Sequence, residues 1–290
     1  MIYCDKRIGD EPRYVLSNSE PSLVIVPDEV RKCVAFIGYR PAGGIPRFAG
    51  TCFFAGRPVE GVPDRNFFYA ITAKHVLDGI RDAGCNEILL RLNQKDGSAV
   101  WASSSLSDRF YHPDESEVVD VAVAYFNLPD GIDHLIYPLA STATEERIDK
   151  EGIGVGEEVF FPGLFIHHYG KGRNLPILRA GNIAAMPEEK VDTQLGPIDA
   201  YLVEARSIGG LSGSPVFVHL GLARFVDGSV KFSTIPSGIF YLLGLMQGHF
   251  APHSTDIDTT DADDTKSKER INMGMVNSPV VAANEAQNAW

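Results

Sequence analysis

The chain has 290 residues and a formal net charge of −12, with ordinary fractions of apolar and charged residues. This length can bury a substantial hydrophobic core. The acidic excess argues against nucleic acid as the main partner, because phosphate binding needs a basic surface. No run of residues is long and apolar enough to cross a bilayer, and residues 1–7 carry charges where a signal peptide needs an apolar core. We therefore expect neither nucleic acid nor a membrane as a partner.

The cysteine pattern bears on the compartment. Cys4, Cys33, Cys52 and Cys85 are widely and irregularly spaced, without the CxxC pairs used for zinc binding or redox chemistry. We interpret them as mostly reduced thiols and predict a cytoplasmic protein.

The first half of the chain contains short apolar runs separated by glycine and proline turns. Residues 1–27 hold few periodic apolar positions, so we expect an N-terminal extension there. A short helix is predicted over 78–83, and Asp96-Gly97 is a hairpin signal between two of the runs. The predicted strands are 30–39, 50–54, 66–72, 87–93, 99–103 and 117–126.

The second half continues the same pattern after a polar connection over 130–150. Asp227-Gly228 predicts another hairpin, 251–270 a polar surface loop, and Ser278-Pro279 the start of a C-terminal helix. The predicted strands are 158–161, 164–168, 177–184, 200–204, 216–219, 239–246 and 271–276. Many short strands with little helix indicate an all-β barrel or sandwich.

A glycine-rich loop over 209–215 is the most informative stretch for chemistry, because glycines flank Ser212 on both sides. Glycine permits positive φ angles and lets backbone come close to a ligand. The loop can therefore hold one hydroxyl beside exposed backbone N–H groups. A serine nucleophile and an oxyanion hole require these groups.

Two further residues complete a possible charge relay with this serine. His75 follows the predicted strand 66–72, at the point where a short helix begins. Asp120 interrupts the apolar run 117–126, where an unpaired buried carboxylate would cost several kcal/mol. An imidazole N–H is a suitable partner for that carboxylate, and the imidazole can then act as a base for Ser212.

Three motifs in this chain resemble those of trypsin-like serine peptidases. The motifs are Thr72-Ala73-Lys74-His75-Val76, Asp120-Val121-Ala122-Val123 and Gly210-Leu211-Ser212-Gly213-Ser214-Pro215. They follow the chymotrypsin order His, Asp, Ser, with separations of 45 and 92 residues close to those of the family. The resemblance covers roughly residues 30–277.

This resemblance implies a chymotrypsin-like fold within a peptidase domain over 28–290. Two six-stranded antiparallel β-barrels, about 28–139 and about 150–277, would be followed by a C-terminal helix over 278–290. His75 and Asp120 would come from the first barrel and Ser212 from the second, meeting in the cleft between them. The implied activity is serine endopeptidase cleavage of a protein or peptide substrate through an acyl-enzyme, without a cofactor. The sequence does not identify which regulatory protein, if any, would be a partner.

The same resemblance assigns further residues to substrate binding. The backbone N–H groups of Gly210 and Ser212 would form the oxyanion hole. Arg206 would lie near the floor of the primary specificity pocket and favour an acidic side chain. A one-residue slip of its strand would instead turn it outward. Gln247 and Gly248 would lie on the strand edge that pairs with substrate backbone.

Two departures from the family pattern indicate which branch of the trypsin-like peptidases the chain resembles. Val76 occupies the position where secreted members often carry a disulfide cysteine. Leu211 replaces the aspartate that pairs with a newly cut N-terminus in activatable members. The chain is therefore most similar to the bacterial branch that includes HtrA-like peptidases, although no PDZ-like region follows.

Other features of the sequence have simpler interpretations, and one alternative function stays open. The pair His167-His168 is interpreted as structural, because neighbouring strand residues point to opposite faces, and we predict no metal site. The acidic stretch 256–264 lacks the calcium-loop pattern. An α/β-hydrolase would need Gly-x-Ser-x-Gly, with its histidine after the serine. A non-catalytic peptide- or protein-binding module that kept the peptidase fold stays open as an alternative.

Overall fold

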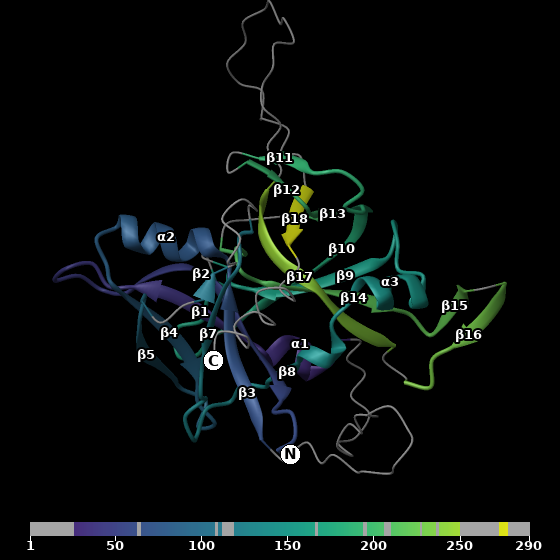
Figure 1. The fold of residues 1–290 in the computed structure, drawn as a ribbon. Helices are drawn as coiled ribbons and strands as arrows, with labels where there is room; N and C mark the ends of the chain where they lie inside the picture. The colour runs from purple at the N-terminus through teal and green to yellow at the C-terminus, as the bar shows by residue number, and fades with distance from the viewer. Residues whose placement is uncertain are drawn as a thin grey trace, which may run out of the picture.

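The structure is a computed structural model in which two curled β-sheets lie side by side, one from each half of the chain (Figure 1). The described residues are 26–62, 65–107, 110–111, 119–165, 168–193, 196–205, 210–226, 228–235, 238–249 and 273–277. Among them no helix is long and apolar enough to traverse a membrane. The predicted extension over 1–27 falls almost entirely outside these ranges, as do the loop 251–270 and the C-terminal helix 278–290.

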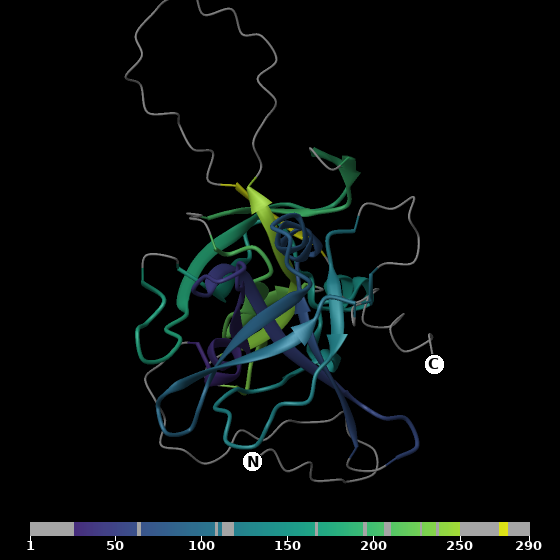
Figure 2. The same cartoon turned by 90° about the vertical axis from the view of Figure 1, so that its left-hand side faces the viewer.

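The first half forms an eight-stranded sheet that faces the viewer in Figure 2. Its order is β5-β4-β1-β2-β3-β7-β6, and β8 adds to β2 as the one parallel pair among the described strands. The bounds are β1 Val34–Tyr39, β2 Arg47–Pro58, β3 Asn66–Thr72, β4 Glu87–Asn93, β5 Ala99–Ser105, β6 Phe110–Tyr111, β7 Ala122–Tyr125 and β8 Tyr137–Pro138. A closed six-stranded barrel was predicted here, but the described strand pairs leave an open order.

The second half forms the six-stranded closed barrel that was predicted, in the order β10-β13-β18-β17-β14-β9. Its interior is apolar, with Val159, Phe161, Val203 and Val218 fully buried. The bounds are β9 Glu158–Gly163, β10 Ile177–Ala185, β13 Tyr201–Glu204, β14 Pro215–Leu220, β17 Ile239–His249 and β18 Met273–Asn277. The strand predicted at 271–276 thus closes the barrel as β18.

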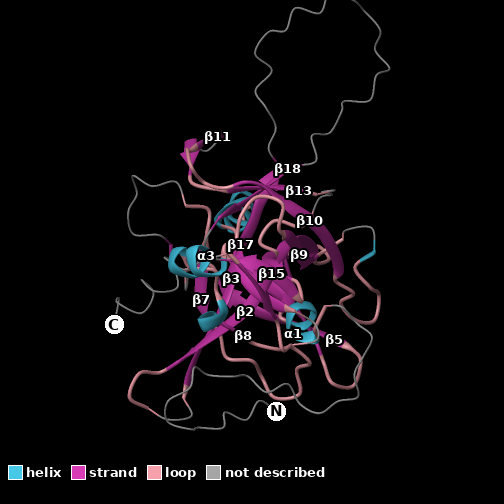
Figure 3. Ribbon diagram, turned by 90° about the vertical axis from the view of Figure 1, so that its right-hand side faces the viewer, coloured by secondary structure: helices cyan, strands magenta, loops and turns pink. Residues whose placement is uncertain are grey.

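Two antiparallel ribbons stand outside the barrel (Figures 1 and 3). One is β11 Val191–Thr193 with β12 Gly196–Ile198, which was not predicted. The other is β15 Ala223–Val226 with β16 Ser229–Phe232, which forms the hairpin predicted at Asp227-Gly228.

Several predicted boundaries were wrong for local reasons. The strand predicted from residue 30 begins instead with helix α1, Asp28–Lys32, whose acidic first turn and basic last turn complement the helix dipole. The polar connection 130–150 contains β8, the 3₁₀ helix η1 Leu139–Ser141 and helix α3 Glu145–Glu151, which Thr144 caps. Leu164, Phe165 and His168 were predicted as strand and lie outside one.

The two halves share a core rather than meeting through a solvated gap. Phe160, Phe217 and Leu245 of the second half belong to the apolar cluster of the first. The ring of Tyr137 packs on Phe217 at a centroid distance of 4.8 Å, and its hydroxyl donates to the carbonyl of Phe240 at 2.8 Å. Residues from both halves are therefore held at fixed positions at this junction.

Candidate active site

His75 is the second residue of helix α2, Lys74–Asp82, which begins two residues after β3 ends. The first backbone N–H groups of a helix lack partners within it, and Ala73 at the cap position has no side chain to accept them. Asp120 supplies the acceptor, because its Oδ1 lies 2.8 Å from the backbone nitrogen of His75. Buried Leu77 and Ile80 anchor the helix in the core.

The sequence predicted Asp120 inside a strand over 117–126. In the structure it lies two residues before β7 begins. Its carbonyl accepts from the backbone N–H of Lys74 at 3.3 Å instead of joining the strand ladder. The side chain is 2% exposed, and Oδ2 lies 2.5 Å from Nδ1 of His75. Both carboxylate oxygens thus serve one histidine, which fixes the ring and leaves Nε2 to act elsewhere.

The loop that carries Ser212 needs glycine at two positions. Gly210 and Gly213 have φ angles of 103° and 83°, and L-residues that carry a Cβ rarely adopt such backbone angles. A Cβ on Gly213 would lie 2.2 Å from the carbonyl oxygen of Thr51 and 2.4 Å from Oγ1 of Thr72. The glycines therefore let the loop lie directly on the first sheet.

The same close packing brings Ser212 to the backbone that carries His75. A Cβ on Gly213 would be 3.1 Å from the nitrogen of Ala73, two residues before the histidine. Gly50 lies between Ser212 and Val76. A Cβ on Gly50 would be 2.9 Å from the carbonyl oxygen of Ser212 and 3.0 Å from Cγ2 of Val76. The structure therefore gathers the three sequence-predicted residues in one place.

The hydroxyl of Ser212 makes a different hydrogen bond from the one that a triad uses. It donates to the backbone carbonyl of Gln247 at 3.3 Å, and no hydrogen bond joins it to His75 among the described residues. Gln247 was predicted as a substrate-binding residue. It lies where the pairing of β17 with β18 shifts register, beside Gly248. Catalytic contacts of this kind are often absent before substrate binds.

Sequence reasoning missed Thr51, a fully buried residue of β2 that connects the two halves at the serine loop. Its hydroxyl donates to the carbonyl of Gly210 at 3.0 Å and accepts from the N–H of Leu164 at 2.8 Å. Its own N–H donates to the carbonyl of Ser212 at 3.0 Å. The only available signal was a polar residue next to Gly50 within an apolar run.

Two neighbours of Ser212 are buried. Leu211 is 2% exposed and packs in the apolar core of the second half. Its side chain carries no charge with which to bind a new N-terminus. Ser214 is fully buried, and its hydroxyl has no hydrogen-bond partner among the residues that the structure describes. That hydroxyl fills the space where a Cβ on Gly163 would stand.

The remaining predicted positions give fewer constraints. Arg206 and His167 lie outside the described residues, so their predicted roles stay predictions. Cys33, Cys52 and Cys85 form no disulfide with one another. In the described ranges no group of histidine, cysteine or carboxylate side chains is arranged to hold a metal ion.

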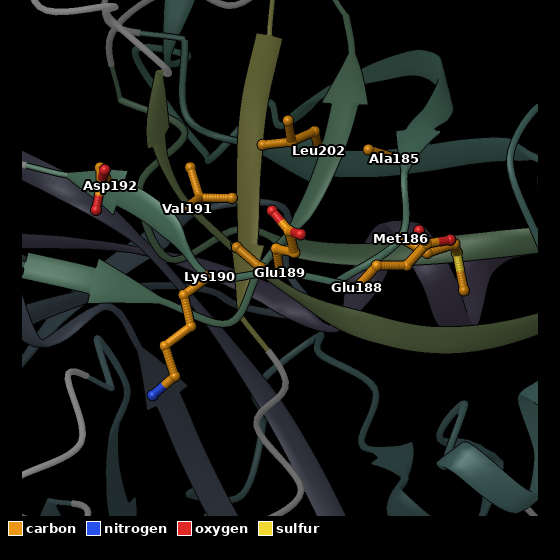
Figure 4. A pocket seen from close by; sticks show the side chains of 9 residues that line it. Ala185, Met186, Glu188, Glu189, Lys190, Val191, Asp192 and Leu202 are labelled. Carbon is orange, nitrogen blue, oxygen red and sulfur yellow. The ribbon is translucent and has the colours of Figure 1, made fainter.

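A surface hollow of about 480 Å³ opens elsewhere, at the base of the β11–β12 ribbon (Figure 4). Its lining includes Glu188, Glu189, Lys190 and Leu202, and none of the predicted site residues. It therefore adds nothing to the candidate active site.

This architecture defines the chymotrypsin-like double-barrel class of fold. The chain is similar to the MamO protease domain from Magnetospirillum magneticum in its apo form, with a TM-score of 0.52 and 14% identity over 89% of this chain and 97% of that one. At this identity the likeness establishes the fold.

Two other solved structures align over most of their lengths. An inactive form of Rv3671c from M. tuberculosis H37Rv gives a TM-score of 0.42 and 18% identity, covering 94% of this chain and 96% of that one. Human heparin binding protein gives 0.48 and 10%, covering 91% and 93%. No protein-family profile matches the sequence, and no curated protein matches it.

Proposed function

We propose that this chain is a serine endopeptidase that hydrolyses peptide bonds through Ser212, His75 and Asp120. One observation supports it most: the buried carboxylate of Asp120 binds both the backbone N–H and Nδ1 of His75, at 2.8 and 2.5 Å. The bond to Nδ1 fixes the tautomer that leaves Nε2 free to act as a base, and the bond from the backbone N–H holds the carboxylate in place. The glycine-flanked serine lies against the same backbone.

The proposed reaction follows from the available atoms. With Nδ1–H donating to Asp120, Nε2 of His75 is the ring atom that takes the proton as Ser212 Oγ attacks the scissile carbonyl. His75 then gives that proton to the leaving amine, and an acyl-enzyme remains on Ser212. A water molecule, deprotonated by the same nitrogen, releases the product acid and restores the serine.

The oxyanion that develops during attack needs fixed N–H donors. We assign this role to the backbone N–H groups of Gly210 and Ser212. Thr51 holds both residues in place by donating hydrogen bonds to their carbonyl oxygens. Loss of one such donor typically lowers turnover about a hundredfold or more.

Substrate binding is proposed along the edge of β17 at Gln247 and Gly248, where an extended peptide can add as a strand. The carbonyl of Gln247 that now accepts from Ser212 becomes available to a substrate N–H once the hydroxyl rotates. Arg206 is proposed at the pocket floor, which favours substrates with an acidic side chain before the cleaved bond.

Within the peptidase class we propose the HtrA-like branch, acting in the cytoplasm. The buried, uncharged Leu211 supports this because it offers no carboxylate for activation by a newly cut N-terminus. The lack of a disulfide among Cys33, Cys52 and Cys85 is compatible with a reducing compartment.

The test is hydrolysis of a peptide library, with each cleavage site read by mass spectrometry. We expect cleavage by the native protein and none above background by Ser212→Ala, which keeps the loop backbone. Enrichment of acidic residues before the cleaved bond would support Arg206 in the pocket. Equal background cleavage by both proteins would contradict the proposed activity.

A peptide-binding module is the second candidate, and the hydrogen bond from Ser212 to Gln247 favours it because the hydroxyl is engaged away from His75. This alternative predicts that library peptides bind with equal affinity to the native protein and Ser212→Ala, and that neither cleaves them.

A further inference from the structure

The β15–β16 ribbon is fixed to the barrel by one of its two faces. Arg224, whose side chain is 16% exposed, binds the carboxylate of Glu157 at 2.6 Å. It also donates to the carbonyls of Glu151 and Gly152 at 3.1 and 3.0 Å, where α3 ends. The ribbon is therefore a positioned arm, visible at the right of Figure 1 and toward the viewer in Figure 3.

The opposite face of the ribbon is apolar and open. Register pairs Ala223 with Phe232 and Phe225 with Val230, so these four side chains share one face. Phe225, Val230 and Phe232 are 74%, 55% and 76% exposed. Single exposed apolar residues are common on proteins, but two phenylalanines and a valine gathered on one small ribbon mark an interaction surface.

This face is complementary to itself. The two phenylalanines occupy one diagonal of a square, and the smaller Ala223 and Val230 occupy the other. A twofold axis in the plane of the ribbon, along or across its strands, would place each Phe ring of one copy over a small residue of the second copy. Closed dimers require such an isologous patch.

We infer that a second copy of this chain covers this face. An aromatic side chain carries about 150–250 Å² when fully exposed, so the two rings and Val230 offer on the order of 400 Å² per copy. Two copies would bury roughly 800 Å², an area typical of weak associations, which predicts a dimer of micromolar or weaker affinity.

Charge favours the same occupant. With a net charge of −12 the chain repels other copies over most approaches, whereas this face carries no charged side chain. An anionic lipid surface would meet the same repulsion. Association between copies is therefore least opposed here, and we expect it to strengthen as salt screens the remaining charges.

Sedimentation equilibrium of the full chain at micromolar concentration tests this inference. We expect a dimer for the native protein, at least a tenfold weaker dimer for Phe225→Asp and Phe232→Asp, and no change for the matched control Ile45→Asp. Ile45 is 80% exposed and lies between β1 and β2 of the first sheet. Ala223→Trp fills one hollow while adding apolar surface, so it should weaken the dimer if the fit is specific.

Two results would overturn the inference. One is a native protein that stays monomeric at these concentrations, including one that instead binds lipid vesicles or an unrelated protein. The other is a dimer that survives both phenylalanine substitutions and Ala223→Trp. A cooperative thermal unfolding transition for each variant shows that it is folded. If the two aspartate variants do not fold, Ala223→Trp still tests the dimer.

Discussion

The two halves of the candidate active site are held in different ways. On the first sheet, His75 is fixed at two points by a carboxylate that is 2% exposed. On the second barrel the loop around Ser212 is fixed through its backbone, yet its hydroxyl binds Gln247. In the proposed mechanism the base is therefore organised before substrate binds, whereas the nucleophile must first leave its bond to Gln247.

The difference has a simple physical origin. A buried carboxylate must be compensated by donors in the folded state, so Asp120 and His75 cannot be left apart without a large penalty. A neutral hydroxyl can exchange one acceptor for another at small net cost. In the proposed mechanism, substrate takes the carbonyl of Gln247 and so releases the hydroxyl of Ser212 for His75.

The strongest test of the fixed half is Asp120→Asn. It preserves shape, but its amide no longer favours the tautomer that leaves Nε2 free to accept a proton. We expect turnover of a cleavable peptide to fall on the order of 10⁴-fold. The unfolding temperature serves as the control for folding. A loss of less than tenfold would mean that Asp120 caps the helix and does no more.

The rigidity of the serine loop is tested by Gly213→Ala. A new Cβ would meet the carbonyl of Thr51 at 2.2 Å, at a residue whose φ is 83°. We therefore expect the unfolding free energy to fall by an amount on the order of 3 kcal/mol, and peptide cleavage to be lost as well. Gly97→Ala is the matched control, because Gly97 has a φ of 89° but open space around it. Denaturant titration should give it a loss of about 1 kcal/mol. Equal losses in the two variants would contradict close packing of the loop.

The first sheet should also lose stability in acid through His134. Burial lowers the pKa of His134 to about 4; Nε2 accepts from the N–H of Asn93 at 2.9 Å, and Nδ1 faces the carbonyl of Lys32 at 3.2 Å. The unfolded chain takes up this proton near pH 6.5, before the folded chain does. Unfolding free energy should therefore fall by about 3 kcal/mol between pH 6.5 and pH 4.

His134→Gln offers the control for this pH effect, because it keeps a donor and an acceptor and does not titrate. Denaturant titrations at several pH values should show a shallower fall for the variant. If the native protein and the variant lose stability in parallel, the histidine is not held neutral.

Thr51→Val removes the hydroxyl that connects the halves while keeping shape. We expect turnover to fall roughly tenfold to a hundredfold with a smaller change in KM, and Thr51→Ser to restore it. Thr142→Val is the matched control, since Thr142 is also buried and its hydroxyl donates to Leu139 at 2.8 Å, apart from the serine loop. A similar loss of turnover in both valine variants would point to general destabilisation.

The sequence was sufficient for what local pattern and chemistry determine. Short apolar runs bounded by turns gave β3 and β4 their observed bounds, and the need to compensate Asp120 pointed to His75. Thr51 could not be found this way, because it contacts a residue 159 positions away through an ordinary buried hydroxyl. The two curled sheets of the predicted fold class are present, but the eight-stranded order of the first could not be predicted, since strand pairing depends on tertiary contacts.

The most direct measurement of the central claim is reaction of the folded protein with a fluorophosphonate, with the adduct located by peptide mass spectrometry. We predict one adduct, at Ser212, in the native protein and in Ser214→Ala, whose altered hydroxyl is buried two residues away. His75→Ala and Ser212→Ala should remain unlabelled. An unlabelled native protein, or labelling that persists without His75, would contradict a serine activated by this histidine.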